Sequence, residues 1–272
     1  MDKIFVLGAG AMAESFIKGV TQGDVADAKS IYVINRHRPD RLAELSETYG
    51  VTPAASMEAA KEAGVIILAV KPYDMRLALV ELSPYLHGQL VISFAAGIPI
   101  AFMENVTQGR AQIIRTMPNV PVAVLEGAIA MATGASVNRE SVDVAKRLLG
   151  KIGIVVELEE HLMDAATAFS GSGPGFVSYF LEAMEDAAVQ LGFSAELARQ
   201  LLIQTVVGTA KVLEEWRLSP AELRRLVTSP NGTTHAGLTV LGNLGMREAI
   251  AQALVQAEGR SREMGEQYTA VE

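Results

Sequence analysis

A glycine-rich turn directly after the first apolar run is the segment with the clearest chemical meaning. Residues 8–13 read Gly-Ala-Gly-Ala-Met-Ala and follow the run Lys3–Leu7. In a dinucleotide fingerprint, Gly8 would permit the tight turn, Gly10 would let a pyrophosphate approach the backbone, and Ala13 would let a helix pack on a strand. A glycine turn without a ligand is the simpler alternative. We predict a dinucleotide contact at Gly8, Ala9, Gly10, Ala11 and Met12.

The end of the second apolar run indicates which dinucleotide would bind. Sites that prefer NAD usually carry Asp or Glu here, where it bonds the ribose hydroxyls. The run Ser30–Ile34 is instead followed by Asn35 and Arg36. An amide and a guanidinium can both donate to a 2′-phosphate. NADPH is therefore the predicted cofactor, with NADH as a weaker one, unless Arg36 and Arg38 are solvated loop charges.

Two further loops follow apolar runs, at 68–72 and 93–97. In an open α/β sheet, ligands bind beyond the carboxyl ends of the strands. Small residues there would let the nicotinamide ribose come close, although Lys71 could equally be a surface charge. We predict that these loops contribute Ala69, Val70, Lys71, Pro72, Ala95, Ala96 and Gly97 to the cofactor site.

Two polar, glycine-containing segments lie in the second half of the chain. Three glycines and Pro174 in residues 170–175 should break a helix, and Pro174 can start the next one. Residues 229–234, Ser-Pro-Asn-Gly-Thr-Thr, precede an apolar run and can cap its helix. Exposed N–H groups at such turns can hold a small carboxylate without Arg or Lys. A plain helix cap is the simpler alternative.

The elements that would position these turns alternate along the first part of the chain. Short runs rich in Val, Ile and Phe alternate with amphipathic stretches at 11–20, 40–49, 73–82 and 139–150. Strand–helix alternation predicts an α/β fold with a mainly parallel, doubly wound Rossmann-type sheet. Short later connections leave room for an antiparallel pairing. The predicted strands are Lys3–Leu7, Ser30–Ile34, Val65–Val70, Leu90–Phe94, Gln112–Thr116, Gly127–Ala132 and Ile152–Glu157.

Helical periodicity replaces this alternation after about residue 160. Apolar and small residues step by three or four from Leu197 to Trp216 and again from Ile250 to Met264. We predict a dinucleotide-binding domain at 1–160 and an all-helical domain at 161–272. Long apolar-faced helices with little sheet often bury their surplus face in a second copy of the chain, so a homodimer is expected.

Composition narrows the functional classes. The 272 residues carry a formal charge of −8, which disfavours nucleic acid binding, and no cysteine, which removes disulfides and thiolate ligands. The four histidines show no metal-ligand spacing, so no metal is expected. No apolar run approaches the length of a membrane span and the N-terminus does not resemble a signal peptide. A cytoplasmic enzyme without membrane contact is predicted.

The chain resembles pyrroline-5-carboxylate reductases over essentially its whole length. The matching segments are GAGAMA at 8–13, LAVKP at 68–72, SFAAGI at 93–98, RTMPNVP at 115–121, SGSGP at 170–174 and SPNGTT at 229–234. The ordered set is far more specific than any one member. The resemblance implies hydride transfer from NADPH to an imino acid, the last step of proline biosynthesis, in dimers that can assemble further.

The resemblance also assigns residues. It implies that Thr234 is catalytic and faces the imine nitrogen. It places Ser56 near the cofactor. Met117 and Asn119 are expected to line the cofactor side of the cleft, although Met117 could equally fill the core. Three positions depart from the family pattern: Asn231 replaces a glycine, Ser56 replaces a common Asn, and Arg217 replaces an acidic residue of some relatives. Substrate contacts are expected from Ser172, Ser229, Asn231, Gly232, Thr233 and Thr234.

Two alternatives stay open at this stage. Another NADP-dependent imine or β-hydroxyacid oxidoreductase has the same two-domain plan, but β-hydroxyacid enzymes use a helical lysine, and Lys211 is the one lysine after residue 151. A diverged family member could instead bind dinucleotide and dimerise without catalysis. Oxidation of NADPH in the presence of pyrroline-5-carboxylate would distinguish a reductase from such a non-catalytic member.

Overall fold

An eight-stranded sheet organises the first part of the chain in this computed structural model, which describes residues 3–36 and 38–270. The strand order is β3-β2-β1-β4-β5-β6-β7-β8. All neighbours are parallel except β6 and β7. The strands are β1 (Lys3–Leu7), β2 (Ile31–Ile34), β3 (Thr52–Pro53), β4 (Ala63–Leu68), β5 (Leu90–Ser93), β6 (Gln112–Met117), β7 (Gly127–Thr133) and β8 (Gly153–Glu157).

The sheet confirms the fold class and the seven predicted strands, including an antiparallel pairing in its far half. β3 was not predicted, because two residues with a proline carry no alternating pattern. The chain reverses direction across the sheet between β1 and β4. This switch point is where a doubly wound sheet binds its ligand.

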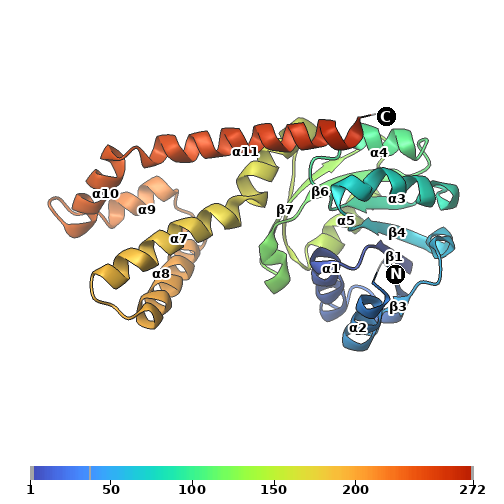
Figure 1. Cartoon of the computed structure of the whole chain (residues 1–272), viewed down its shortest axis with the longest axis horizontal. Coiled ribbons are helices and arrows are strands. Elements are labelled where there is room, and N and C mark those ends of the chain that lie inside the picture. The colour runs from blue at the N-terminus through green and yellow to red at the C-terminus, as the bar shows by residue number, and fades with distance from the viewer. Residues whose placement is uncertain (1–2, 37, 271–272) are drawn as a thin grey trace. The chain divides into compact units, whose positions relative to one another are not determined.

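Helices cover both faces of the sheet (Figure 1). Alternate side chains of each strand point to opposite faces, so Ile4 and Val6 join one apolar cluster and Phe5 and Leu7 join the other. The first cluster is closed by α1 (Ala11–Gln22), α2 (Pro39–Tyr49) and α5 (Arg139–Leu149), and the second by α3 (Met75–Leu82) and α4 (Ile100–Val106). The sheet is therefore buried between two helical layers, as parallel sheets require.

The glycine-rich segment at 170–175 interrupts the α-helix with a π turn. α6 (Met163–Ala166) runs into a π turn at Thr167–Gly171, and α7 (Gly173–Gln190) begins beside Pro174 as predicted. The backbone N–H of Ser172 donates to the carbonyl of Thr167 at 2.8 Å, five residues earlier. The hydroxyls of Ser170 and Ser172 also donate to backbone carbonyls. The break is thus a wide helical turn and not an open loop.

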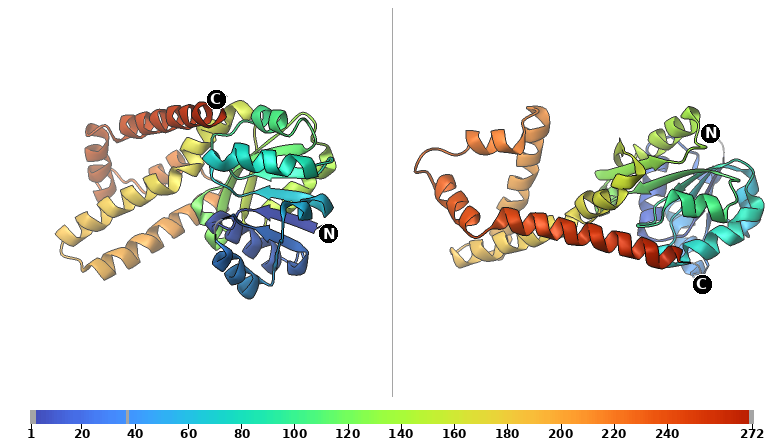
Figure 2. Two further views of the ribbon diagram at one scale, coloured as in Figure 1. Left: turned by 45° about the vertical axis from the view of Figure 1, so that its right-hand side comes forward. Right: turned by 90° about the horizontal axis from the view of Figure 1, so that it is seen from above.

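Helices alone follow, and the structure confirms the all-helical second part. Figure 2 shows α7 and α8 (Ala195–Glu215) side by side, and an ion pair between Glu185 and Arg199 joins them at 2.6 Å. The remaining helices are α9 (Pro220–Leu226), α10 (Thr233–Asn243) and α11 (Met246–Thr269). Among the described residues, no helix is long and apolar enough to cross a membrane.

Contacts group the chain into two compact units. Unit 1 contains residues 1–174 and 255–272, and unit 2 contains residues 175–254. The predicted boundary between the two domains, at residue 160, follows the end of β8. The grouping by contacts instead places residues 161–174 and the second half of α11 in unit 1, together with the sheet.

Unit 2 has almost no interior of its own. Across residues 175–254, all of which the structure describes, Ala198 is the single buried residue. Large apolar side chains are exposed instead, such as Tyr179 at 76% and Leu244 at 79%. An isolated helical unit with so little buried apolar surface would not offset the entropy lost on folding. The exposed faces therefore fit burial against a second chain.

The second half of α11 packs closely on the rest of unit 1. Gly97 has a φ of +75°, and a Cβ on it would lie 3.2 Å from the backbone nitrogen of Gly265. A Cβ on Gly265 would collide with the carbonyl oxygen of Gly97. Beside this contact, the Ser261 hydroxyl donates to Asp164 at 2.9 Å, and Asp164 accepts from the buried guanidinium of Arg115 at 3.2 Å.

Gly265→Ala should destabilise the protein, because the added methyl group meets backbone that cannot move without shifting the 95–97 loop. We expect a loss of about 1–3 kcal/mol, the usual cost of overpacking, measured as a lower midpoint of thermal or urea unfolding. Gly259→Ala is the matched control in the same helix, since a Cβ there meets nothing within 4 Å. It should be neutral or stabilising by up to about 1 kcal/mol. Equal midpoints for the two variants would contradict the close contact.

Candidate functional site

The turn between β1 and α1 is fixed by its neighbours on both sides. The backbone N–H of Gly8 donates to Ile34 of β2 at 2.9 Å, and the N–H of Ala69, after β4, donates to Leu7 at 2.9 Å. Gly8 has a φ of +111°, and a Cβ there would lie 2.5 Å from the carbonyl oxygen of Ala69. Both the backbone angle and the close approach require glycine.

Gly10 differs from Gly8 because the space beside it is open. It is the N-cap residue of α1, it is exposed, and a Cβ on it would meet nothing within 4 Å. The first N–H groups of a helix have no partner inside the helix. The turn therefore presents backbone donors and the positive end of the α1 dipole to an open space beside Gly10, an arrangement suited to a phosphate.

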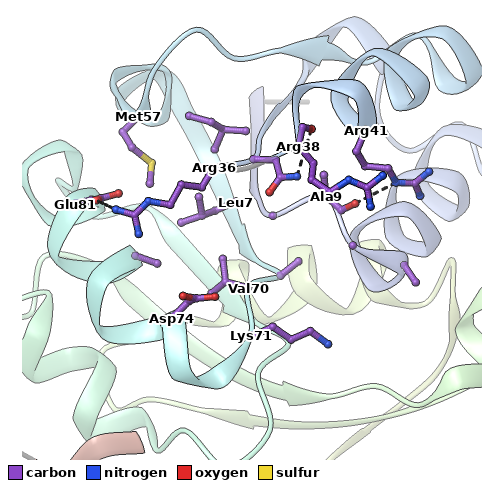
Figure 3. Close-up of a pocket in the computed structure, with 17 residues that line it drawn as sticks. Leu7, Ala9, Arg36, Arg38, Arg41, Met57, Val70, Lys71, Asp74 and Glu81 are labelled. Atoms are coloured by element: carbon purple, nitrogen blue, oxygen red, sulfur yellow. Dashed lines mark hydrogen bonds and ion pairs between the residues drawn. The ribbon is translucent and has the colours of Figure 1, made fainter.

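A pocket of about 490 Å³ opens at this turn (Figure 3). Its volume lies in the range of small-molecule and cofactor sites. It forms at the carboxyl ends of β1, β2 and β4, at the switch point of the sheet. The structure brings nine of the predicted cofactor residues to its wall: Gly8, Ala9, Gly10, Ala11, Asn35, Arg36, Ala69, Val70 and Lys71.

Asn35 and Arg36 lie at the end of the pocket formed by β2. The Asn35 amide donates to the carbonyl of Arg38 at 3.5 Å. Nη2 of Arg36 donates to Oε1 of Glu81, in α3, at 2.8 Å. Arg38 also lines the pocket, and its guanidinium pairs with Asp40 at 2.8 Å. The loop thus presents two guanidinium groups near the place expected for a 2′-phosphate.

Arg41 is a pocket residue that the sequence did not reveal. Its Nε donates to the carbonyl of Ala9 at 3.2 Å, while its other nitrogens pair with Glu44 at 2.6 Å and with Glu14. The hydrogen bonds to Glu44 and Glu14 raise the pKa of Arg41. Arg41 therefore ties α2 to the glycine turn. In the sequence it reads as an ordinary surface pair with Glu44, three residues along a helix.

The opposite wall of the pocket was also missed. It comes from α3 and from the short helical turn after β3. Asp74 and Glu81 bring carboxylates, and Met57 and Ala78 bring apolar surface. No motif pointed to this wall, because these residues are far from the glycine turn along the chain and show no recognisable pattern.

Other predicted cofactor residues do not line this pocket. Ser56 accepts a hydrogen bond from the N–H of Glu58 at 3.3 Å and caps a helical turn next to the pocket residue Met57. Met12 packs against the core, and Pro72 begins the turn before α3. Ala95, Ala96 and Gly97 follow β5; Ala95 and Gly97 are buried, and Gly97 lies against Ser261 and Gly265.

Met117 and Asn119 meet the π turn of unit 1. The Asn119 amide donates to the carbonyl of Ser170 at 3.0 Å and accepts from the N–H of Ala128 at 2.9 Å. A Cβ on Gly171 would lie 2.5 Å from the methyl group of Met117. The segments at 115–121 and 170–174 are thus adjacent, and Ser172 follows directly at the start of α7.

The predicted substrate loop lies in unit 2, at the start of α10. Asn231, which replaces a glycine of the family pattern, has a φ of +58°, a left-handed conformation that Asn adopts more readily than most residues. The helix cap is Gly232, without a side-chain hydrogen bond, and not the Ser, Asn or Thr expected from the sequence. A Cβ on Gly232 would collide with the Ser229 hydroxyl oxygen. Ser229, Asn231, Thr233 and Thr234 are exposed, and the first N–H groups of α10 lack partners inside the helix.

Comparisons with known proteins cover both units. Residues 160–264 match the family model described as pyrroline-5-carboxylate reductase dimerisation. Residues 3–97 match the model described as NADP oxidoreductase, coenzyme F420-dependent. The chain is 38% identical to pyrroline-5-carboxylate reductase 2 of Bacillus subtilis, over 98% of this chain and 97% of that protein.

Two solved structures show the same fold over nearly the whole chain. A pyrroline-5-carboxylate reductase from Coxiella burnetii has a TM-score of 0.91 and 33% identity, covering 97% of this chain and 98% of its own. A pyrroline carboxylate reductase from Plasmodium falciparum, solved with NADP bound, has a TM-score of 0.87 and 28% identity over the same shares.

The glycine turn with its pocket and the helical unit are both features of a chain that is similar over its whole length to pyrroline-5-carboxylate reductases. The chain belongs to the pyrroline-5-carboxylate reductase family of oxidoreductases.

Proposed function

We propose that this protein reduces 1-pyrroline-5-carboxylate to L-proline with NADPH. The observation that carries the proposal is the pocket at the β1–α1 turn, which combines an open glycine, a helix N-terminus and three guanidinium groups. Family membership over almost the full length supports the substrate. NADH is expected to serve as a weaker cofactor.

The residues of the pocket fit a phosphorylated dinucleotide. Gly10 leaves room for the diphosphate beside the N-terminus of α1. Asn35 and Arg36 line the pocket and would bind the 2′-phosphate, and the Plasmodium falciparum relative was solved with NADP. Ala69, Val70 and Lys71 follow the neighbouring strand and would extend the contact toward the nicotinamide half. We propose that Met12, Ser56, Pro72, Ala95, Ala96, Gly97, Met117 and Asn119 border the same cofactor outside this pocket.

The start of α10 is the proposed site for the substrate carboxylate. Backbone N–H groups of Gly232, Thr233 and Thr234 would bind it, and the α10 dipole would favour its negative charge. Ser229 and Asn231 shape the turn, and Ser172 is proposed as a further substrate contact. The dinucleotide supplies a hydride for the C=N carbon of the ring.

The chain's own part in the reaction is to bind, orient and protonate. A protonated imine already accepts hydride readily, so no strong acid is needed. The Thr234 hydroxyl would bond the ring nitrogen and relay its proton, and the helix N-terminus would fix the ring relative to the dinucleotide. Enclosure by a second chain would exclude water from the ring.

The exposed apolar faces of unit 2 and the match to a dimerisation domain indicate a homodimer. We propose that such dimers can assemble further, as the family resemblance implies, and that the enzyme works in the cytoplasm.

The decisive experiment is a turnover assay with the purified full chain. With pyrroline-5-carboxylate present, NADPH absorbance should fall and proline should form in equal amount. Binding of NADPH without turnover would support a non-catalytic relative instead, and turnover of β-hydroxyacids alone would support the other oxidoreductase class.

Thr234→Ala should lower turnover while NADPH affinity stays the same, because the hydroxyl acts on the ring and not on the dinucleotide. Loss of one general acid contact typically costs about 10²-fold or more in rate. Steady-state kinetics with pyrroline-5-carboxylate and calorimetry with NADPH would measure the two effects. Thr239→Ala, one turn further along the same helix, is the control. Unchanged turnover in Thr234→Ala would remove this residue from the mechanism.

Arg36→Ala should weaken NADPH more than NADH, because a guanidinium hydrogen bond to a phosphate has no counterpart at a ribose hydroxyl. A charge-assisted bond contributes roughly 1.5–3 kcal/mol, so the NADPH dissociation constant should rise about ten-fold or more. Isothermal titration with each dinucleotide measures this. Equal losses for NADPH and NADH would show that Arg36 does not read the 2′-phosphate.

A further inference from the structure

Glu81 is a carboxylate inside the cofactor pocket that the proposed reaction does not use. It lies in α3, on the wall opposite the glycine turn, and is 45 residues from its partner Arg36 along the chain. We propose that Glu81 determines how strongly the pocket prefers NADPH over NADH, by competing with the 2′-phosphate for the guanidinium of Arg36. The proposal rests on the proposed use of NADPH.

The geometry places the two side chains in direct contact. Nη2 of Arg36 and Oε1 of Glu81 are 2.8 Å apart, and the side chains are 51% and 41% exposed. Figure 3 shows the Arg36 side chain reaching toward Glu81 and away from Arg38 and Arg41. The arginine best placed by the sequence to bind phosphate is therefore already bound to a carboxylate.

The other arginines of the pocket also pair with carboxylates, but those carboxylates do not line the pocket. Arg38 pairs with Asp40, and Arg41 pairs with Glu14 and Glu44. Among the carboxylates of these pairs in the described part of the chain, Glu81 alone lines the pocket. A phosphate bound by Arg36 would thus meet a competing anion within the pocket itself, whereas the partners of Arg38 and Arg41 lie outside it.

The free energies of the two interactions indicate that the Arg36–Glu81 pair weakens binding of the 2′-phosphate without preventing it. An exposed Arg–carboxylate pair contributes about 0.2–1 kcal/mol. A phosphate monoester carries a charge of about −1.5 to −2 near neutral pH and forms stronger hydrogen bonds with a guanidinium. NADPH can therefore displace Glu81 from Arg36, and its affinity is lowered by the strength of the pair. NADH brings a hydroxyl in place of the phosphate and does not enter this competition.

Glu81→Gln tests the competition, since it removes the charge and keeps the shape. Adenosine 2′,5′-bisphosphate and adenosine 5′-monophosphate differ by the 2′-phosphate alone, so they isolate its contribution. We expect calorimetry to show roughly two- to five-fold tighter binding of the bisphosphate and of NADPH, which corresponds to about 0.4–1 kcal/mol, the upper part of the range for an exposed pair. Binding of the monophosphate and of NADH should change less than two-fold.

Two further variants test whether the effect is specific to the pair of Arg36 and Glu81. Glu62→Gln removes the same charge from the exposed pair with Lys3, outside the pocket, and should leave all four affinities unchanged. In an Arg36→Ala background, Glu81→Gln should lose most of its effect, because no guanidinium is left to compete for.

Three outcomes would overturn the proposal. Weaker bisphosphate binding in Glu81→Gln would show that Glu81 holds Arg36 ready for the phosphate. If all four ligands bound equally more tightly to Glu81→Gln, the substitution would act as a general charge effect. If Glu81→Gln still tightened bisphosphate binding in the Arg36→Ala background, Glu81 would repel the phosphate and not compete for Arg36. None of these outcomes contradicts the proposed function. The proposed function would be contradicted if the unsubstituted protein bound neither NADPH nor NADH.

Discussion

A side chain on Gly8 would come within 2.5 Å of the carbonyl oxygen of Ala69, and the architecture of the cofactor pocket follows from that proximity. The turn can pass so close to β4 because it lacks a Cβ and adopts a positive φ. The hydrogen bonds to Ile34 and from Ala69 hold it between the neighbouring strands. α1 therefore starts at the switch point of the sheet, with its free N–H groups beside the open space at Gly10.

The helical part obeys a different constraint. Its helices are regular, but nearly all their apolar side chains are exposed, and residues 175–254 bury little beyond Ala198. Unit 1 has two complete apolar clusters and needs no partner for its core. The exposed apolar faces of unit 2 fit burial against a second chain, which agrees with its match to a dimerisation domain. Cofactor binding is thus supported by the fold of one chain, while the proposed substrate loop belongs to the unit that has almost no core of its own.

Local patterns predicted most of the fold, and distant contacts account for what they missed. Seven strands carried clear apolar runs, and the glycine turn could be placed because its chemistry lies within six consecutive residues. Arg41, Asp74 and Glu81 belong to no motif, and their role arises when α2 and α3 fold beside the turn. The close approach of Gly97 to Gly265 was likewise beyond reach, because 168 residues separate them. The helix cap at Gly232 was misassigned since Ser, Asn and Thr are the usual caps, and here Ser229 packs against the glycine instead.

Gly10 offers the most direct test that the β1–α1 turn holds a dinucleotide diphosphate. Its φ of −78° suits alanine and a Cβ would meet nothing within 4 Å, so Gly10→Ala should fold normally. A methyl group there would occupy the space beside the free N–H groups. Calorimetry should then show NADPH and NADH both weakened by about ten-fold or more, the loss expected for backbone bonds to a charged group, in a protein whose unfolding midpoint changes little. Unchanged affinity for both dinucleotides would contradict this account.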